Sequence, residues 1–582
     1  MRKGFVVFPV AGAVVAAIAW VAPAAQAVTG TSVRVNVANP ASPFPPNKSA
    51  EAAVAINPVA PSMVAASAFD ETDEAPCGTP AALAGGGVCG FAPGVGTTGA
   101  YFSFDSGHHW IQPAFTGLTA RSGTVHFGTI HTLPWYFESG LVSDADSAVA
   151  FGPRPVNGHF SWTNGVRAYF GNLTSNLNAK KSETFKGFES VAVSRIDNPT
   201  PGRVGVKSNW FRPVIAVTHQ SSTAFEDKDQ IWADNASSSP FFGHVYACFA
   251  EFRGLGHFQN GNEPAPLVVA ASTDGGTTWS KKQLNPAATT PQSQQGFGTS
   301  GCTIRTTSTG VVDLFAFVFS AGTPGTGFHV LFQSFDGGKS WTRPRRLFPV
   351  NNGCFFIDPV EGRCVSDGIA GSRIDLSPAP SVDIANGAPT GKDATNEIVD
   401  SWVDGRFGFN HEKVLFSFST NGAKTWSSPQ IVPGPGRGFY SAPAISPNGK
   451  TVFEANSWLL APFQNNTTNP RPEVNTLQQS AIGANGAPTG WSMPVVGAVG
   501  DLRAASANGL AFEFSGDYNY ASAARTFGIG VWTADARDAT HCAAIDAWRA
   551  SLFTATPLPQ PNPATACPGR FGNINIFAGT TG

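Results

Sequence analysis

Four short segments of this 582-residue chain repeat one pattern, and that repeat restricts the possible folds more than any other feature. Residues 103–110, 272–279, 334–341 and 419–426 follow Ser-x-Asp-x-Gly-x-Thr-Trp. The Asp carboxylate accepts hydrogen bonds from turn amides and Gly takes a positive φ, so each copy predicts a hairpin turn. The Trp starts the next strand and buries its ring. In the fourth copy, Asn421 and Ala423 replace Asp and Gly, so we expect a distorted turn there.

The composition agrees with many short strands joined by tight turns. The chain has 64 Gly and 45 Pro, 11% aromatic residues and only 13% charged residues. It contains no heptad run, no Gly period and no shortage of apolar residues, which excludes coiled coil, collagen and general disorder. A net charge of -2 without a basic run gives no electrostatic basis for nucleic-acid binding.

The start of the chain resembles a secretory signal peptide. Met1, Arg2 and Lys3 form a short basic segment, residues 4–24 are apolar, and Ala25-Gln26-Ala27 supplies a small-x-small cleavage site. We expect residues 1–27 to be removed and the mature protein to be secreted, with no membrane contact after cleavage. An uncleaved anchor is the alternative.

The eight cysteines fit an oxidising compartment. None forms a CxxC pair, and a single adjacent pair, His541 with Cys542, does not make a zinc-ligand pattern, so we expect no metal site and no cofactor. Pairing by proximity gives Cys77–Cys89, Cys354–Cys364 and Cys542–Cys567 as loop staples, with Cys248–Cys302 joining adjacent units. This is one of 105 possible connectivities.

Seven short apolar runs predict the inner strands of seven repeated units. They are residues 53–56, 148–151, 230–232, 302–304, 381–384, 442–445 and 518–520. We expect an all-β chain forming one β-propeller of four-stranded antiparallel blades, with seven favoured and six possible. The propeller is placed at 51–552, after a linker at 28–50 whose residues 32–37 are a possible ring-closing strand. Residues 553–582 are expected to form a Pro-rich tail.

The repeated segments resemble the Asp boxes of the sialidase-like (BNR-repeat) β-propellers. In that family the box joins the third and fourth strands of a blade at the rim, away from the catalytic pocket. The resemblance therefore implies structural roles for Asp105, Asp274 and Asp336.

A second resemblance concerns residues 210–254. Residues 210–213 read Trp-Phe-Arg-Pro, similar to the Phe-Arg-Ile-Pro motif of sialidases, and residues 249–253 read Phe-Ala-Glu-Phe-Arg, similar to a family strand motif. The resemblance implies that Arg212 clamps a substrate carboxylate and that Glu251 and Arg253 support it. Arg406 and Arg537 are candidates for the other clamp arginines, or for Asp–Arg pairs that hold loops.

The family nucleophile is a tyrosine activated by a glutamate. Tyr440 has the closest context, Tyr518 beside Asp517 is the competing choice, and Glu263 is the candidate activator. The loop after Arg253 lacks the expected acid/base aspartate. Asp227 and Asp229, at the start of an inner strand, are substitutes only in a different geometry.

These features support three hypotheses for a monomeric protein whose partner is a glycan or glycoprotein. The first is an exo-α-sialidase acting on terminal sialic acids or a similar acidic sugar. The second is a non-catalytic propeller that binds glycan or protein, and the third is another propeller glycosidase that uses two carboxylates. The third requires a pair such as Asp229 and Asp517 roughly 5–10 Å apart. Convergence of Arg212, Arg406 and Arg537 in one pocket would favour the first.

Overall fold

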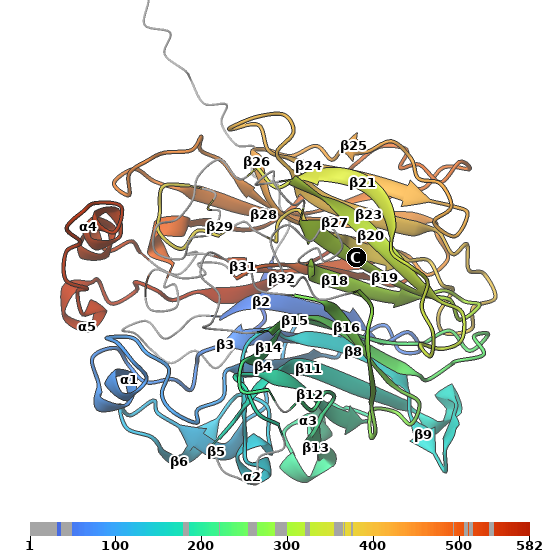
Figure 1. Cartoon of the computed structure of the whole chain (residues 1–582), viewed down its shortest axis with the longest axis horizontal. Coiled ribbons are helices and arrows are strands. Elements are labelled where there is room, and N and C mark those ends of the chain that lie inside the picture. Colours follow the sequence, from blue (N-terminus) through green and yellow to red (C-terminus); the bar gives the residue numbers. More distant parts are fainter. Residues whose placement is uncertain are drawn as a thin grey trace, which may run out of the picture.

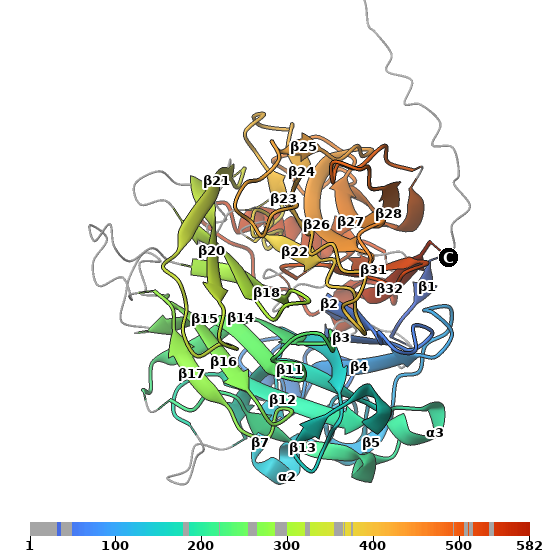
Figure 2. The same ribbon diagram turned by 90° about the vertical axis from the view of Figure 1, so that its right-hand side faces the viewer.

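Seven antiparallel sheets surround one central axis in the computed structural model, which Figure 2 views from the end of the ring. The model describes residues 32–36, 49–177, 185–219, 221–253, 265–285, 299–319, 326–353, 365, 367–373, 376–492, 494–505, 510, 516–534 and 540–581. Five sheets have four strands, one has three and one has five. The prediction of an all-β, seven-bladed propeller is confirmed.

The first four blades follow one another in chain order. Blade 1 contains β2 (Ser49–Ile56), β3 (Val64–Asp70) and β4 (Thr98–Ser103). Blade 2 contains β7 (Leu141–Ser143), β8 (Ala148–Pro153), β11 (Val166–Asn176), β12 (Ser190–Asp197) and β13 (Trp210–Ile215). Blade 3 contains β14 (Ala224–Ala233), β15 (Val245–Arg253), β16 (Leu267–Ser272) and β17 (Ser280–Gln283). Blade 4 contains β18 (Thr299–Thr306), β19 (Val312–Phe319), β20 (Thr326–Ser334) and β21 (Arg345–Asn351).

The remaining three blades complete the ring. Blade 5 contains β22 (Ser381–Ile384), β23 (Ile398–Asp404), β24 (Lys413–Ser419) and β25 (Gln430–Ile431). Blade 6 contains β26 (Arg437–Ile445), β27 (Thr451–Leu459), β28 (Pro472–Ala481) and β29 (Val495–Asp501). Blade 7 contains β30 (Tyr520–Ala523), β31 (Gly528–Ala534), β32 (Asn575–Thr580) and β1 (Val33–Arg34). The inner strands β2, β8, β14, β18, β22, β26 and β30 all overlap the predicted apolar runs.

The N-terminal strand closes the ring on the last blade. β1 pairs antiparallel with β32, with Val33 opposite Ala578. Closing the ring in this way covers the edge of β32 and makes β1 the outermost strand of blade 7. Residues 553–582 were expected to form a tail, but β32 belongs to the propeller, so this boundary is corrected. The Pro-rich composition before β32 had hidden a strand that begins only at Asn575.

The Asp boxes have the predicted turn geometry. In the second box, Asp274 Oδ1 accepts hydrogen bonds from Ser272 Oγ at 2.8 Å and from the Thr278 amide at 2.9 Å. In the fourth box, Asn421 Oδ1 accepts the Thr425 amide at 3.0 Å, and Ala423 adopts a φ of +60°. The expected distortion is therefore wrong: an amide oxygen replaces the carboxylate, and Ala takes the conformation that Gly takes elsewhere.

Short elements outside the blades complete the described chain. Two hairpins are β5 (Phe115–Thr119) with β6 (His126–Ile130), and β9 (Pro155–Val156) with β10 (His159–Phe160). The helices are α1 (Pro80–Ala84), α2 (Tyr136–Ser139), α3 (Pro201–Val204), α4 (Ala543–Ser551) and α5 (Pro563–Ala566), with 3-10 turns η1 (Trp162–Asn164), η2 (Lys207–Asn209) and η3 (Leu502–Ala504). No helix within the described ranges is long and apolar enough to cross a membrane.

Long connections gather at the end of the ring where the inner strands begin. Because strands in a blade alternate in direction, the links from second to third strands and between blades share this end. It carries residues 71–97, 112–147 and 540–574, and α1, α4 and α5 lie together at one side of Figure 1. The opposite end has short turns such as residues 57–63 and 446–450. We call the elaborated end the mouth.

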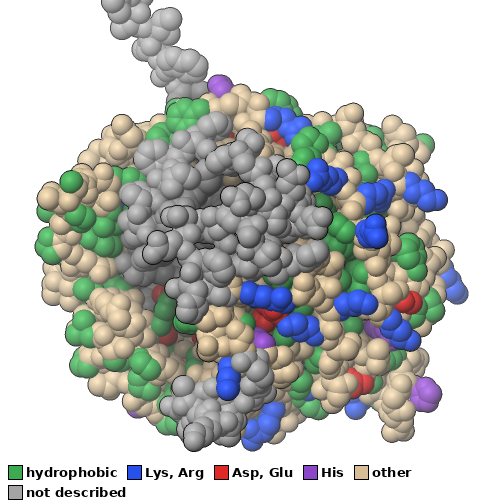
Figure 3. All heavy atoms as spheres, in the orientation of Figure 1, with side chains coloured by type: hydrophobic (Ala, Val, Ile, Leu, Met, Phe, Trp, Pro, Cys, Tyr) green, Lys and Arg blue, Asp and Glu red, His purple; other side chains and the backbone are tan. Residues whose placement is uncertain are grey.

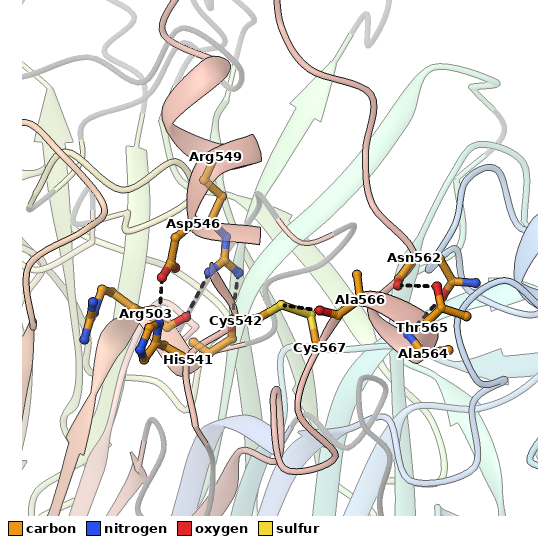
Figure 4. Close-up of a disulfide and its surroundings, with 11 residues drawn as sticks. Arg503, His541, Cys542, Asp546, Arg549, Asn562, Ala564, Thr565, Ala566 and Cys567 are labelled. Atoms are coloured by element: carbon orange, nitrogen blue, oxygen red, sulfur yellow. Dashed lines mark hydrogen bonds and ion pairs between the residues drawn. A yellow bond between two sulfur atoms is a disulfide. The ribbon is translucent and has the colours of Figure 1, made fainter. Parts of the chain in front are cut away.

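Three disulfides link the described chain. Cys77–Cys89 and Cys542–Cys567 are local, and Figure 4 shows the latter joining the segment before α4 to the end of α5. Cys248–Cys302 joins β15 of blade 3 to β18 of blade 4. These three predicted pairs are confirmed, whereas Cys354 and Cys364 lie outside the described residues.

A buried aspartate in blade 4 predicts how stability depends on pH. Asp313 is 1% exposed, and burial raises its pKa to about 7, although Gln333 donates a hydrogen bond to it at 2.7 Å. Because the folded-state pKa exceeds the unfolded one, stability is present at low pH and lost as pH rises from about 4 towards 7. A shift of this size corresponds to roughly 4 kcal/mol.

We therefore expect Asp313→Asn to reduce the loss of stability between about pH 5 and pH 8, measured by urea unfolding. Asp393→Asn is the control, because Asp393 is exposed, pairs with Arg525 and has a lowered pKa. Equal pH dependence in the Asp313→Asn variant and the unsubstituted protein would show that Asp313 is ionised in the folded state.

Candidate functional site

Bulges at the start of several inner strands turn charged side chains towards the mouth. The register shifts between Ala50 and Ala53 in β2 and between Asp227 and Gln230 in β14. Glu51 and Lys228 lie in these two bulges with φ of 55° and 60°. Asp146, just before β8, has φ of 50°. Such backbone is unfavourable for residues other than Gly, and it often occurs where a side chain is re-aimed for function.

The bulges bring seven buried charged residues together, which we name the mouth cluster. They are Glu51, Asp146, Asp227, Lys228, Asp229, Arg373 and Asp517. Lys228 Nζ lies 3.2 Å from Asp227 Oδ1 and 3.7 Å from Asp146 Oδ2, and it also contacts Asp517. Arg373 forms a second ion pair with Asp517. Residues in or just before the inner strands β2, β8, β14 and β30, which belong to four blades, thus contribute to one network.

Charge balance requires that some of these carboxyls hold protons. Two cations face five carboxyls, and an unpaired buried carboxylate is strongly unfavourable. Burial raises the pKa of Asp146 to about 7 and the pKa of Asp227 well above its ordinary value, while Lys228 opposes both shifts. The two carboxyls also hydrogen-bond to each other. We therefore interpret Asp146 and Asp227 as a pair that shares one proton.

Lys228 remains charged inside this network. Burial lowers its pKa, but the nearby carboxyls of Asp146, Asp227 and Asp517 raise it by a larger amount. The pKa of Lys228 therefore lies well above its ordinary value. A charged ammonium needs carboxylate partners, and it is held by three of them here. The cluster is therefore an ion network surrounded by neutral acids.

A hollow of about 250 Å³ lies beside the mouth cluster and has acidic and aromatic walls. Its acidic lining residues are Glu74, Asp144, Asp146, Glu189 and Asp227, and its aromatic ones are Phe69, Phe91 and Phe225. Burial and the neighbouring charges of Asp144, Asp146 and Asp227 raise the pKa of Glu189 well above its ordinary value. Burial raises the pKa of Asp144 to about 7. The hollow thus contains carboxylic acids that keep protons near neutral pH.

A second, smaller hollow of about 40 Å³ adjoins the same cluster near the axis. Lys228, Tyr440, Asp517 and Tyr518 line it. The Tyr440 hydroxyl donates towards the carbonyl of Gly516 at 2.5 Å, with the Arg373 carbonyl at 3.2 Å. The hydroxyl of Tyr518 and both carboxyl oxygens of Asp229 have no hydrogen-bond partner on another described residue.

The structure therefore brings part of the predicted site together. Tyr440, Asp517 and Tyr518 share the smaller hollow, and the charge of Asp229 acts on Tyr518. The Tyr440 hydroxyl contacts the backbone carbonyls of Gly516 and Arg373. The predicted acids Asp227, Asp229 and Asp517 thus lie at the mouth, and the pairing of a tyrosine with Glu263 stays a prediction.

Arg212 does not lie at the mouth, which corrects the clamp prediction. It belongs to β13, the outermost strand of blade 2, and is exposed. Its Nη1 donates to the Glu138 carbonyl at 2.9 Å, and its guanidinium lies 4.9 Å from the centroid of the Trp135 ring. Its local sequence resembles the family motif, but Arg212 lies on the outermost strand of blade 2.

The other predicted clamp residues that are described are each paired with neighbouring side chains. Glu251 and Arg253 pair at 2.6 Å at the end of β15, where Glu251 also binds Lys281. Arg406 donates two hydrogen bonds to the Asp404 carboxylate, at 2.8 and 2.7 Å. This matches the second of the two predicted roles, an Asp–Arg pair that holds a loop. Glu263 and Arg537 lie outside the described residues. No three-arginine clamp forms from the predicted residues that are described.

Sequence reasoning missed Glu51, Asp144, Asp146, Glu189, Lys228 and Arg373. A usable signal was present for some of them, because the Asp-Lys-Asp run at 227–229 and the acids at 51 and 146 precede or interrupt apolar strand-forming runs. A charge at such a position is unexpected in a buried strand. For Glu189 and Arg373, which lie on connections, no such signal exists.

Comparison with solved structures finds sialidases and a lectin among the similar folds. An unknown-function protein from Dyadobacter fermentans aligns at 11% identity and a TM-score of 0.39, covering 75% of this chain and 94% of the other. The Hadza microbial sialidase Hz136 aligns at 12% identity and 0.37, covering 68% and 64%. The BP39L lectin from Burkholderia pseudomallei aligns at 10% identity and 0.39, covering 77% and 84%.

Neither family models nor curated proteins match the sequence. The structural neighbours therefore stand as similarities of fold, and the functional argument rests on the residues of this chain.

Arg212 offers a simple check of where the site lies. We expect Arg212→Ala to change glycan binding or turnover by less than about fivefold, because an exposed contact contributes under roughly 1 kcal/mol. Binding by calorimetry, with Lys450→Ala as a second variant at the opposite end of the ring, measures this. A tenfold or greater loss of glycan binding in Arg212→Ala alone would show that Arg212 on blade 2 binds the substrate carboxylate.

Proposed function

We propose that this protein is a secreted glycoside hydrolase that cleaves glycans at the propeller mouth with two carboxyl groups. The observation that carries the proposal is the hollow in which Glu189 faces the Asp146–Asp227 pair, with pKa values raised by burial and mutual charge. Glycosidic cleavage needs a proton donor for the leaving oxygen and a second carboxylate for the sugar carbon or water. Carboxyls with displaced pKa values in a cleft are the groups that perform these two roles.

Glu189 acts as the general acid in this proposal. Burial and three neighbouring acids oppose its ionisation and raise its pKa well above that of an ordinary glutamate. It can donate that proton to the glycosidic oxygen as the bond breaks.

The Asp146–Asp227 pair supplies the second carboxylate. One of the two carboxyls is ionised beside the Lys228 ammonium, and the shared proton lies on the other. The ionised oxygen either attacks the anomeric carbon or removes a proton from water. Lys228 stabilises this negative charge without leaving the network.

The hollow favours neutral or basic sugars over acidic ones. Phe69, Phe91 and Phe225 offer apolar faces against which a sugar ring can pack, with Phe91 exposed. The two cations of the mouth cluster, Lys228 and Arg373, are already bound to carboxyls. A sialic acid carboxylate would meet the acids of the hollow, so we rank exo-sialidase activity below hydrolysis of a neutral glycan.

Export after cleavage of residues 1–27 and a monomeric state belong to the same proposal. The three disulfides support an oxidising compartment. A glycan or glycoprotein is the expected partner.

A non-catalytic glycan-binding propeller is the second candidate. Asp146, Asp227, Lys228 and Asp517 are each no more than 7% exposed, and such burial also suits a network that only fixes the blades together. In that case the aromatic hollow would bind sugar without cleaving it.

A substrate panel separates the two candidates. The purified protein is incubated with aryl glycosides of neutral, amino and sialic sugars and with polysaccharides, and reducing ends are measured. We expect turnover on a neutral or amino sugar and less on the sialoside. Binding without release of reducing ends would establish the non-catalytic alternative, and turnover confined to the sialoside would contradict the charge argument.

A further inference from the structure

Basic side chains concentrate on the outer edge of blades 3 to 5, although the whole chain has a net charge of -2. Lys281 and Lys282 lie on β17, and Lys339 lies in the Asp-box turn of blade 4. Arg343 and Lys424 are exposed at the neighbouring turns, and they complete the set with Arg345 and Arg346 of β21. We call these seven residues the basic rim. Figure 3 shows Lys and Arg side chains gathered over the right-hand part of this face, where Figure 1 places β16, β20 and β21.

The basic rim is continuous across blade boundaries. Lys282 Nζ donates to the Lys339 carbonyl at 2.9 Å, which ties blade 3 to the turn of blade 4. Arg345 Nη1 lies 3.5 Å from the Lys424 carbonyl, which ties blade 4 to the turn of blade 5. The outer strand of one blade thus places its cations beside the cation of the next turn.

The carboxylates along this edge are already occupied by other groups. Asp274 and Asp336 accept hydrogen bonds from their own box turns, and Glu251 pairs with Arg253 and Lys281. Among the described residues, Lys282, Lys339, Arg343, Arg345 and Lys424 form no ion pair. The basic rim therefore carries excess positive charge at the surface.

A groove of about 410 Å³ runs through the blade 4–5 part of the basic rim. Arg345, Arg346 and Lys424 line it, and Trp426 and Phe348 form an aromatic base with ring centroids 5.8 Å apart. The Nε1 group of Trp426 is a donor without a hydrogen-bond partner on a described residue. Aromatic rings beneath a row of cations suit a polymer that alternates sugar rings with negative charges.

We propose that the basic rim binds a linear polysaccharide bearing carboxylates, separately from the mouth. The guanidinium group of Arg345 can pair with a planar carboxylate through two hydrogen bonds, and Arg346 adds positive charge beside it. Lys282, Lys339 and Lys424 extend the contact along the chain. Such binding would hold the protein on an acidic glycan matrix, whatever reaction takes place at the mouth.

Calorimetry with polygalacturonate tests the proposal on the full-length protein. We expect binding that weakens as salt rises from about 50 to 200 mM, and a loss of about tenfold or more in the Arg345→Ala/Arg346→Ala/Lys424→Ala variant. The matched control Arg203→Ala/Lys392→Ala/Lys450→Ala removes the same charge from exposed positions elsewhere. It should bind like the unsubstituted protein.

Two further probes use the same variants. Fully methyl-esterified polygalacturonate keeps the sugar backbone without its charge, and we expect no binding. Equal binding of the ester, or equal losses in both triple variants, would overturn the proposal. Tighter binding of duplex DNA than of polygalacturonate at the same salt would also overturn it, in favour of a nucleic-acid surface.

Discussion

Glu189→Gln is expected to reduce turnover by about 10²- to 10⁴-fold while the protein remains folded, because the amide keeps the shape of the side chain but cannot supply the proton. The reduction should appear in both kcat and kcat/KM, since the proton is transferred only as the bond breaks. Initial rates on the best glycoside of the panel measure it.

Glu397→Gln is the matched control for this variant. Glu397 is a buried glutamate in the turn before β23, at the end of the ring opposite the mouth, and burial raises its pKa to about 7. Removing a carboxyl with a raised pKa should therefore leave turnover unchanged there. Full activity in Glu189→Gln, or equal losses in both variants, would exclude Glu189 as the general acid.

Lys228→Met is expected to destabilise the fold by about 3–5 kcal/mol at neutral pH. The substitution removes one of two cations from a network of five buried carboxyls, and a buried charge left without its partner is strongly unfavourable. The pKa of Asp146 is about 7 even beside Lys228, so the remaining carboxyls take up protons as the pH falls through this range and the loss should shrink. Urea unfolding at several pH values measures both effects.

Lys282→Met provides the comparison for this second prediction. Lys282 is exposed on β17 and donates only to a backbone carbonyl, so its loss should cost under about 1 kcal/mol at every pH. A Lys228→Met variant as stable as Lys282→Met would show that water reaches the mouth cluster and screens its charges.

The sequence predicted the architecture because the signals for it are local. An Asp box identifies its own turn, and an apolar run such as residues 398–402 or 442–445 identifies a buried strand wherever it occurs in the ring. Cys248 and Cys302 were paired correctly because adjacent blades place their strands side by side. β32 was missed because it follows a Pro-rich stretch and is separated by a long connection from β31, the strand of blade 7 with which it pairs.

The candidate site was only partly predictable because it depends on register between blades. Tyr440, Asp517 and Tyr518 were identified by local context and do meet at the mouth. Arg212 was chosen by a motif that takes no account of which strand of the blade carries it, and that strand faces outwards. Lys228 faces the mouth through a bulge in β14, and the position of a bulge cannot be inferred from composition or spacing.

The pH dependence of kcat/KM on the best glycoside tests the central claim most directly, namely that protonated carboxyls at the mouth perform the reaction. If Glu189 is the acid, activity should fall as the pH rises, with a midpoint well above the ordinary pKa of a glutamate. Asp227→Asn should shift that midpoint downwards or abolish turnover, because it alters the charge that acts on Glu189. A rate that stays constant or increases as the pH rises through this range would contradict the account.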